Sequence, residues 1–333
     1  MSVKAPQKIL IIRFSSIGDI VLTFPVVKAL KLTFPNCKID FVTKKGFVGL
    51  LQACPEIDHI FALDQSLSNL RKEIPFAHYD AVIDLHHNLR SRLLTIFHLG
   101  KVYRFPKDNL RKWLLTSFKI KPKHSKHVVD RYLEPVRRAF QADFIGVQNA
   151  YQVPKDAQID ILEKTGFQPG QYVAVAIGAQ FATKRMPTEI LIPLLQKING
   201  PILLLGGKED IEVAQKILKA LPNVSIQSQV GKCSIHESAW LVQNAAQLLT
   251  HDTGLMHIGA CFQMPIHLIW GNTVRDFGMY PYRLEQENCF HYEVQDLACR
   301  PCSKIGHQAC PKGHFSCMRK QNIEQIATEL NKA

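Results

Sequence analysis

The hydrophobic and polar positions of the chain repeat one pattern from end to end. Continuous apolar runs, typical of parallel strands buried on both faces, alternate with stretches in which apolar residues recur every three or four positions, as on a helix face. The runs predict strands at 8–13, 38–43, 59–63, 79–85, 102–105, 172–177, 201–205, 224–226, 248–251 and, as the last strand, 265–270. The stretches predict helices at 20–32, 46–53, 88–99, 108–117, 126–140, 189–197, 210–221, 235–245, 254–261 and 321–333.

This order of elements predicts an α/β protein with two Rossmann-like domains, each built on a doubly wound parallel sheet. We expect an N-terminal domain at 1–155 and a C-terminal domain at 156–320, followed by the terminal helix 321–333. The stretch 277–320 has little periodicity and is interpreted as loop-rich. Because ligands bind beyond the carboxyl ends of parallel strands, we expect the site in a cleft between two facing sheets.

The composition excludes several classes of protein. Of the 333 residues 46% are hydrophobic and 21% are charged, which is typical of globular domains and excludes a disordered or collagen-like chain. No uncharged apolar stretch reaches the roughly 18 residues of a membrane-spanning helix, and the first residues contain no signal-peptide core. Nine cysteines in such a chain are typical of thiols or metal ligands. We therefore expect a cytoplasmic protein.

The positive charge is concentrated in the first half of the chain. Residues 1–150 contain 24 basic and 12 acidic side chains, and 101–138 contain 12 and 3, while the net charge of the whole chain is +13. Such a field attracts nucleic acid, a phosphorylated lipid surface or a phosphorylated substrate. A basic surface that only aids solubility is the alternative.

The first motif that could carry chemistry is RFSSIGDI, at 13–20 between the first strand and the first helix. It lacks the GxGxxG pattern of a dinucleotide-binding turn, which disfavours a nicotinamide-dependent enzyme. Gly18 permits a tight turn close to a ligand. Asp19 is interpreted either as a helix-capping carboxylate or as a general base.

A second motif is HDTGLMH, at 251–257, also between a strand and a helix. Thr253 and Gly254 open a helix turn whose free amides suit a diphosphate. The alternative roles are structural, because Asp252 could cap the helix and His257 could pack against it.

Two further motifs also follow predicted strands. Lys184 and Arg185 come after 172–177, and two adjacent cations there can neutralise phosphate or remain solvated. Glu209 and Asp210 come after the strand at 201–205, where a carboxylate can accept hydrogen bonds from ribose hydroxyls or cap the next helix.

Two arginines follow the strand predicted at 79–85. Arg90 and Arg92 stand where the cleft should open, so we expect them to hold an anionic ligand rather than to be solvated surface charges. Two residues apart on a helix, they diverge by about 200°, so we expect one of them at most to face the ligand.

Taken in order, these motifs resemble those of glycosyltransferase family 9, the ADP-heptose:lipopolysaccharide heptosyltransferases. KILIIRFSSIGDIVLTFPVVKAL is similar to the opening of that family, and HDTGLMHIGACFQMPIHLIWGNT is similar to its donor-site signature. YDAVIDLHHNLRSRLL and CPKGHFSCM also resemble family segments. The resemblance extends over most of the chain.

The resemblance implies a GT-B architecture, with the acceptor in the N-terminal domain and the nucleotide sugar in the C-terminal domain. It implies inverting transfer of heptose from an ADP-sugar to a phosphorylated lipid-saccharide, the lipopolysaccharide inner core. Such an acceptor puts a cytoplasmic enzyme at the inner face of the inner membrane. Inversion needs a single carboxylate base, and no DxD-like run follows a strand, so we expect that no cofactor is required.

The roles of the family's residues carry over to matching positions. Asp19 matches the proposed base. Ser16 and Gly18, in the same motif, and Arg90 and Arg92, after the strand at 79–85, are assigned to the acceptor from their positions. The residues that match the donor site are Lys184, Asp252, Thr253, Gly254, Leu255 and His257, and either Glu209 or Asp210 matches the carboxylate that binds the ribose.

A Cys-rich appendage at 289–317 contains five of the nine cysteines. Cys299, Cys302, Cys310 and Cys317 read C-x2-C-x7-C-x6-C, in which the first pair has the spacing of zinc ligands and the second is loose. Structural zinc, free buried thiols and an occasional disulfide all stay open. The cluster also supports a zinc-containing nucleic-acid-binding protein, but the basic charge lies in the other half, so we expect no nucleic-acid partner. A transferase that uses another nucleotide sugar is the remaining alternative.

Overall fold

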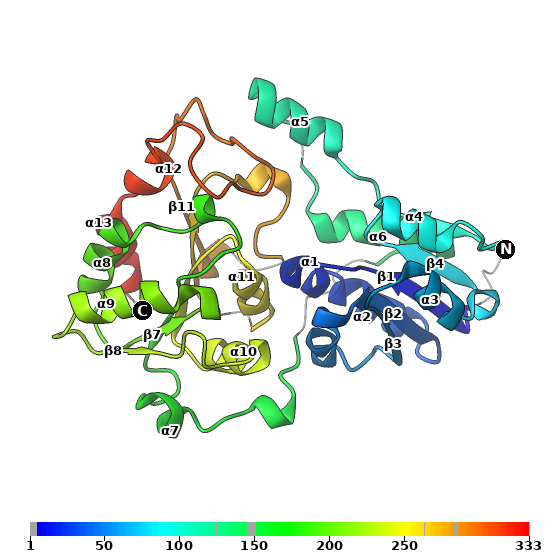
Figure 1. Cartoon of the computed structure of the whole chain (residues 1–333), viewed down its shortest axis with the longest axis horizontal. Coiled ribbons are helices and arrows are strands. Elements are labelled where there is room, and N and C mark those ends of the chain that lie inside the picture. Colours follow the sequence, from blue (N-terminus) through cyan, green and yellow to red (C-terminus); the bar gives the residue numbers. More distant parts are fainter. Residues whose placement is uncertain (1–4, 124, 145–150, 263, 283–285, 333) are drawn as a thin grey trace. The chain divides into compact units, whose positions relative to one another are not determined.

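The computed structural model describes residues 5–123, 125–144, 151–262, 264–282 and 286–332. The chain divides into two compact units (Figure 1). The N-terminal unit comprises Met1–Asp108 and Lys126–Gln152, and the C-terminal unit comprises Asn109–Ser125 and Val153–Ala333. The segment Asn109–Ser125 groups with the C-terminal unit, in which Lys119 Nζ donates a hydrogen bond to the carbonyl of Pro301 at 2.7 Å.

The N-terminal unit is built on a five-stranded parallel sheet with the order β3-β2-β1-β4-β5. In the central strand β1 the residues from Ile9 to Ile12 are fully buried, as expected of a strand covered on both faces. The strands are β1 Lys8–Ile12, β2 Lys38–Lys44, β3 His59–Leu63, β4 Ala81–Asp84 and β5 Val102–Arg104. The helices are α1 Ile17–Val21, α2 Phe24–Thr33, α3 Leu67–Glu73, α4 Leu89–Thr95 and α6 Val128–Phe140.

The C-terminal unit has a six-stranded parallel sheet with the order β11-β10-β9-β6-β7-β8. The strands are β6 Val173–Ala176, β7 Ile202–Leu205, β8 Ile226–Ser228, β9 Gln247–His251, β10 Ile266–Trp270 and β11 Cys289–Glu293. The helices are α5 Asn109–Phe118, α7 Ile161–Thr165, α8 Thr188–Gln196, α9 Ile211–Ala220, α10 Ile235–Gln243, α11 Gly254–Gly259, α12 Ser316–Arg319 and α13 Ile323–Leu330.

Helices α3, α7 and α12 were not predicted from the pattern, and three predicted features differ in the structure. The stretch at 20–32 is two helices, α1 and α2, because Pro25 stands in the first turn of α2, a position that suits proline only at a helix start. The stretch at 46–53 forms two short 3₁₀ helices rather than one α-helix. The expectation that 265–270 is the last strand is wrong, since β11 pairs with β10 in parallel. Strand β11 lies at the sheet edge and is only half-buried, so its apolar signal is weak.

His267 of β10 fixes β11 to the sheet. Its Nε2–H donates to Gln247 Oε1 at 2.7 Å, so its Nδ1 accepts a hydrogen bond from the hydroxyl of Tyr292 in β11 at 2.8 Å. The ring also stacks on Phe290 of β11, with 4.6 Å between ring centroids. Burial lowers the pKa of His267 from 6.5 to about 4, so the imidazole is neutral at physiological pH.

We expect the free energy of unfolding to fall as the pH drops from about 6.5 to about 4. The unfolded chain takes up a proton on His267 below its ordinary pKa of 6.5, whereas the folded chain does so only near pH 4. The loss should reach about 3 kcal/mol for this residue. Urea denaturation at a series of pH values measures it. The variant His267→Gln should flatten the slope, and exposed His78→Gln should not; an equal slope in both would contradict the assignment.

Candidate functional site

Each sheet has one point at which the strand order reverses. In the N-terminal unit this point lies between β1 and β4, and in the C-terminal unit it lies between β6 and β9. Loops that leave such a pair of strands diverge and open a crevice at their carboxyl ends, which is where open α/β sheets bind ligands. The predicted base Asp19 follows β1, and the predicted donor residues Lys184 and Asp252 follow β6 and β9.

Asp19 lies in the first turn of α1, where both roles considered for it are compatible. Its Oδ2 accepts hydrogen bonds from the Ser16 hydroxyl at 2.8 Å and from the Ser16 N–H at 3.3 Å, as a capping carboxylate does. Its Oδ1 forms an ion pair with Arg13 Nη2 at 2.7 Å and accepts a hydrogen bond from the Tyr132 hydroxyl at 3.4 Å. The side chain is 24% exposed, so a ligand can reach it.

Arg13 is a buried cation that connects β1 to the loop after β4. Its Nη1 donates to the carbonyl of Leu85 at 2.6 Å, and its Nε donates to that of Ser15 at 2.8 Å. Burial acts to lower the pKa of Arg13, but the charge of Asp19 and further anionic groups outweigh burial and raise it. Arg13 therefore stays charged, and its guanidinium lies beside the carboxylate of the candidate base.

Lys107 adds a positive charge to the surroundings of Asp19, where His86 contributes a neutral ring. Burial, together with the charges of Arg13 and Lys107, lowers the pKa of His86 to about 3, so its ring is neutral at physiological pH. Burial and the charges of Arg13 and Arg92 lower the pKa of Lys107. The sequence analysis did not single out Arg13, His86 or Lys107. The signal for Arg13 was its place in the first motif, and for Lys107 the basic stretch 101–138.

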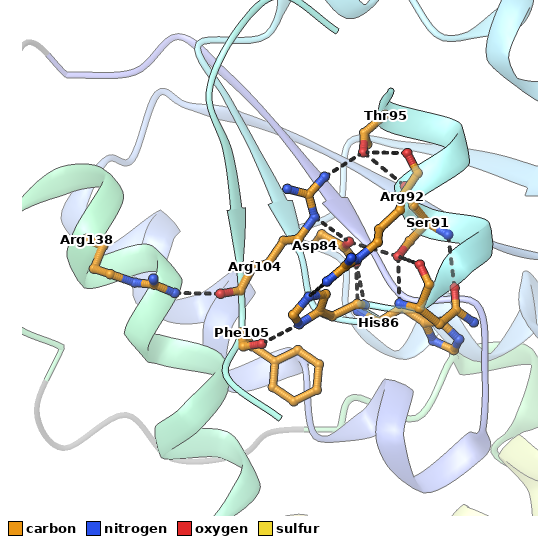
Figure 2. Close-up of polar contacts among 10 residues, drawn as sticks. Asp84, His86, Ser91, Arg92, Thr95, Arg104, Phe105 and Arg138 are labelled. Carbon is orange, nitrogen blue, oxygen red and sulfur yellow. Dashed lines mark hydrogen bonds and ion pairs between the residues drawn. The ribbon is translucent and has the colours of Figure 1, made fainter. Parts of the chain in front are cut away.

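Asp84, at the end of β4, is fully buried and stands at the centre of the polar network in Figure 2. Its Oδ1 accepts hydrogen bonds from the backbone N–H groups of His86 at 3.0 Å and His87 at 2.7 Å. Its Oδ2 accepts one from the Ser91 hydroxyl at 2.8 Å and pairs with Arg104 Nε at 3.4 Å. This residue, also missed from sequence, fixes the turn between β4 and α4.

The two candidate acceptor arginines of α4 have different surroundings. Arg92 Nη2 donates to His87 Nε2 at 2.9 Å, and His87 Nδ1–H donates to the carbonyl of Phe105 at 2.9 Å (Figure 2). Arg90 instead lines a surface pocket of about 740 Å³. The two side chains therefore have different surroundings, and the assignment of either one to the acceptor stays a prediction.

The pocket lined by Arg90 lies where β2 and β3 end. It carries three cations, one carboxylate and several hydroxyl and amide groups, a lining suited to an anionic saccharide. The lining residues are Lys44, Lys45, Gly46, Leu63, Asp64, Gln65, Ser66, Leu67, Ser68 and Arg90. Lys45 pairs with Asp64 at 2.8 Å, which leaves Lys44 and Arg90 without an ion pair among the residues that the structure describes.

Lys184 and Asp252 meet at the reversal point of the C-terminal sheet. Lys184 Nζ lies 2.7 Å from Asp252 Oδ2, which also accepts a hydrogen bond from the Thr273 hydroxyl at 2.9 Å. Behind them His251 Nε2 accepts from the N–H of Met186 at 3.0 Å, and burial lowers the pKa of His251 to about 4. A neutral His251 therefore joins β9 to the segment that carries Lys184, a link that sequence reasoning missed.

The remaining residues of the HDTGLMH motif divide into a cap and a packed face. The Thr253 hydroxyl accepts a hydrogen bond from the N–H of Met256 at 3.4 Å and so caps α11, which begins at Gly254. Leu255 is half-buried, while His257 is 3% exposed. The alternative that His257 packs against the helix therefore fits its burial.

The two carboxylates after β7 differ sharply in exposure. Asp210 is 1% exposed, accepts a hydrogen bond from the N–H of Gly207 at 2.9 Å and pairs with Arg185 Nη1 at 3.3 Å. A Cβ atom at Gly178 would lie 2.1 Å from Asp210 Oδ2, so that glycine leaves room for the carboxylate. Asp210 is thus held inside the unit, whereas the side chain of Glu209 is exposed.

The cysteine appendage contains thiols. Among the described residues, no group of three His, Cys, Asp or Glu side chains is arranged to hold a metal ion. Cys299 Sγ lies 3.8 Å from His314 Nε2. Burial raises the pKa of Cys317 to about 11, and burial with the neighbouring thiols Cys299 and Cys310 raises that of Cys302. Structural zinc at these four cysteines stays a prediction.

Comparisons with known sequences identify the family of the chain. The model of a family described as glycosyltransferase family 9 (heptosyltransferase) matches residues 67–308. Lipooligosaccharide heptosyltransferase 2 of Haemophilus influenzae is 28% identical over 295 residues, which cover 80% of this chain and 84% of that protein.

Solved structures share the fold. A family 9 glycosyl transferase from Veillonella parvula superposes with a TM-score of 0.78 at 20% identity, over 97% of this chain and 96% of that one. E. coli heptosyltransferase WaaC with ADP-2-deoxy-2-fluoro heptose superposes with a TM-score of 0.67 at 20% identity, over 97% of this chain and 99% of that one. The predicted fold class, two Rossmann-like parallel-sheet units of GT-B type, is confirmed. None of the described helices is both long and apolar enough to span a membrane.

Proposed function

The chain belongs to glycosyltransferase family 9, and we propose that it transfers heptose from ADP-heptose to the lipopolysaccharide inner core, with inversion at the anomeric carbon. The donor is supported by the WaaC structure with an ADP-sugar analogue, and the acceptor class by relatives that are lipooligosaccharide or lipopolysaccharide heptosyltransferases. We assign the acceptor to the N-terminal unit and the donor to the C-terminal unit. Because the proposed acceptor is anchored in lipid, we place the enzyme at the inner face of the inner membrane as a peripheral protein.

The observation that carries the proposal is the chemistry at the two strand-reversal points. The N-terminal point carries an accessible carboxylate, Asp19, paired with the buried cation Arg13. The C-terminal point carries Lys184 beside the first turn of α11. A base in one unit and a cation with free amides in the other are the two parts that an inverting transfer from a nucleotide sugar needs.

In the proposed reaction Asp19 acts as the general base. A hydroxyl of the acceptor attacks the anomeric carbon, and its proton passes to Asp19 as the new glycosidic bond forms. The bond from the anomeric carbon to the β-phosphate oxygen breaks, and its electron pair leaves with ADP. One displacement inverts the configuration, so no second carboxylate is needed as a nucleophile.

The donor residues stabilise the leaving diphosphate. Lys184 supplies a positive charge, and the N–H groups at the start of α11, from Gly254 and Leu255, supply hydrogen bonds to the developing charge. Asp252 holds Lys184 in place at 2.7 Å. Of the two carboxylates after β7, we assign the exposed Glu209 to the ribose hydroxyls and Asp210 to the support of the loop through Gly207 and Arg185.

The donor proposal is tested by thermal unfolding with nucleotide sugars. ADP-heptose should raise the melting temperature, and UDP-, GDP- and dTDP-sugars should not, because binding to the folded state alone stabilises it. Lys184→Ala should abolish most of the shift and slow transfer, while exposed Lys197→Ala, a matched control, should retain both. Stabilisation by another nucleotide sugar alone, or by nucleic acid alone, would contradict the proposal.

The acceptor proposal is tested with the two arginines of α4. Arg90→Ala should raise KM for a phosphorylated acceptor and leave KM for ADP-heptose unchanged, because Arg90 lines the cationic pocket. The effect should shrink as salt rises, since exposed charges are screened over about 8–10 Å near physiological ionic strength. Arg92→Ala, whose side chain contacts His87, is the matched control with a smaller effect. Equal acceptor KM values in wild type and Arg90→Ala at low salt would place the acceptor elsewhere.

A further inference from the structure

The outer face of α4 and the turn that follows it expose a row of large apolar side chains. Between 46% and 103% of each side chain is accessible, although most large apolar residues of the unit are buried. The row, called the α4 surface below, comprises Leu89, Leu93, Ile96, Phe97 and Leu99. The first four have the spacing of one helix face, i, i+4, i+7 and i+8.

The opposite face of α4 is fixed to the sheet, so the apolar row cannot turn inward. The Ser91 hydroxyl donates to Asp84, and Arg104 Nη2 donates to Thr95 Oγ1 at 2.9 Å (Figure 2). Leu94, on the same inner face, is 1% exposed. A helix held by buried hydrogen bonds on one face therefore presents a fixed apolar face on the other.

The residues around the α4 surface are basic. Residues 85–107 contain five lysines and arginines and no aspartate or glutamate. The guanidinium of Arg71, on the neighbouring helix α3, lies 3.9 Å from the centroid of the Phe97 ring, and Lys72 follows it. Among the described residues, Arg71, Lys72, Arg90 and Lys101 form no ion pair with an acidic side chain; Glu73 is the only acidic residue of α3.

We infer that the α4 surface docks on an anionic lipid bilayer, with its apolar side chains among the acyl chains and the flanking cations at the phosphates. Apolar area and attraction to anionic lipids act together in the binding of such amphipathic surfaces. A protein partner with a matching apolar patch would not require the run of basic residues without acidic ones. The positive charge around the α4 surface complements the negative charge of an anionic bilayer, so the bilayer is the partner that we infer.

The inference rests on the proposed function in one respect, because it takes the acceptor to be anchored in a lipid bilayer. Arg90 follows Leu89 directly and lines the pocket assigned to the acceptor saccharide. Docking through the α4 surface therefore brings that pocket close to the headgroups, where a lipid-anchored saccharide is found. The concentration of acceptor at the pocket rises with no additional contact to the sugar.

Vesicle flotation with the full-length protein tests the inference. The wild type should float with vesicles of phosphatidylglycerol and phosphatidylcholine, less so at high salt, and should not float with phosphatidylcholine alone. The variant Leu93→Asp/Phe97→Asp should bind the anionic vesicles at least about tenfold more weakly. Leu32→Asp, which changes an exposed leucine on α2 of the same unit, is the matched control and should bind like the wild type.

A second variant separates a loss of vesicle binding from a loss of folding. Leu99→Asp lies outside α4 at a fully exposed position and should weaken vesicle binding without any change in melting temperature. Undiminished binding of both variants, or equal binding of the wild type to neutral vesicles, would overturn the inference. Dimerisation of the wild type in light scattering that the double variant abolishes would also overturn it, because a second copy would then cover the surface.

Transfer assays separate this inference from the proposed function. With a deacylated, water-soluble acceptor the double variant should match the wild type, and with a vesicle-embedded acceptor its rate should fall in line with its binding. Equal rates of both proteins on the embedded acceptor would overturn the docking role. Absence of heptose transfer by the wild type on either acceptor would contradict the proposed function, while the flotation result would still decide the docking surface.

Discussion

Replacement of Asp19 by asparagine should lower the rate of transfer about 10²–10⁴-fold and leave the affinity for ADP-heptose unchanged. The amide keeps the size of the side chain and an oxygen that accepts hydrogen bonds from Ser16, but it cannot take the proton of the acceptor hydroxyl. Donor affinity should not change, because Lys184 and the start of α11 belong to the other unit. Single-turnover transfer and calorimetric titration with the donor measure the two quantities.

Ser16→Ala is the control that separates proton transfer from helix capping. It removes the hydroxyl that donates to Asp19 Oδ2 but leaves the carboxylate and its ion pair with Arg13. We expect a much smaller loss of rate than in Asp19→Asn. Near wild-type turnover by a folded Asp19→Asn variant would remove Asp19 from the mechanism. An equal loss in both variants would assign Asp19 to positioning the loop rather than to the proton.

The fold is largely predictable because several of its central strands are mostly apolar. β7, and β1 after Lys8, are continuous aliphatic runs, which are typical of strands buried on both faces of a parallel sheet. The edge strand β11, CFHYE, alternates instead and is held by His267 through contacts that are distant in sequence. A strand this short and half-buried gives only a weak local signal, so the prediction that the last strand ends at residue 270 is wrong.

For the candidate site, the strands that its residues follow are more predictable than the groups buried behind them. Asp19, Lys184 and Asp252 follow strands, and strand order alone brings such residues to a reversal point. The sequence could not separate Glu209 from Asp210, because the difference between them is burial against Gly207 and Arg185. Family membership likewise favours the transferase over the nucleic-acid-binding protein that the cysteine cluster alone would allow.

Asp84→Ala should lower the free energy of unfolding by about 3 kcal/mol. The carboxylate is fully buried, and its removal leaves the backbone N–H groups of His86 and His87, the Ser91 hydroxyl and Arg104 without their acceptor. Urea denaturation measures the loss. Amide hydrogen exchange should rise most over 88–95, because the network holds α4 on the sheet.

Two further aspartate variants decide whether the burial and charge of Asp84 cause the expected loss of stability. Asp80 also accepts two backbone hydrogen bonds, from Gln7 at 2.7 Å and Lys8 at 2.9 Å, but it is exposed. Water can therefore replace the carboxylate, and Asp80→Ala should lower the free energy of unfolding by about 0.5 kcal/mol. Asp84→Asn keeps the acceptor for His86 and His87 but turns an amide toward Arg104, so its cost should fall between the two. If Asp84→Ala costs no more than Asp80→Ala, the network does not hold α4, and the fixed orientation of the α4 surface loses its physical basis.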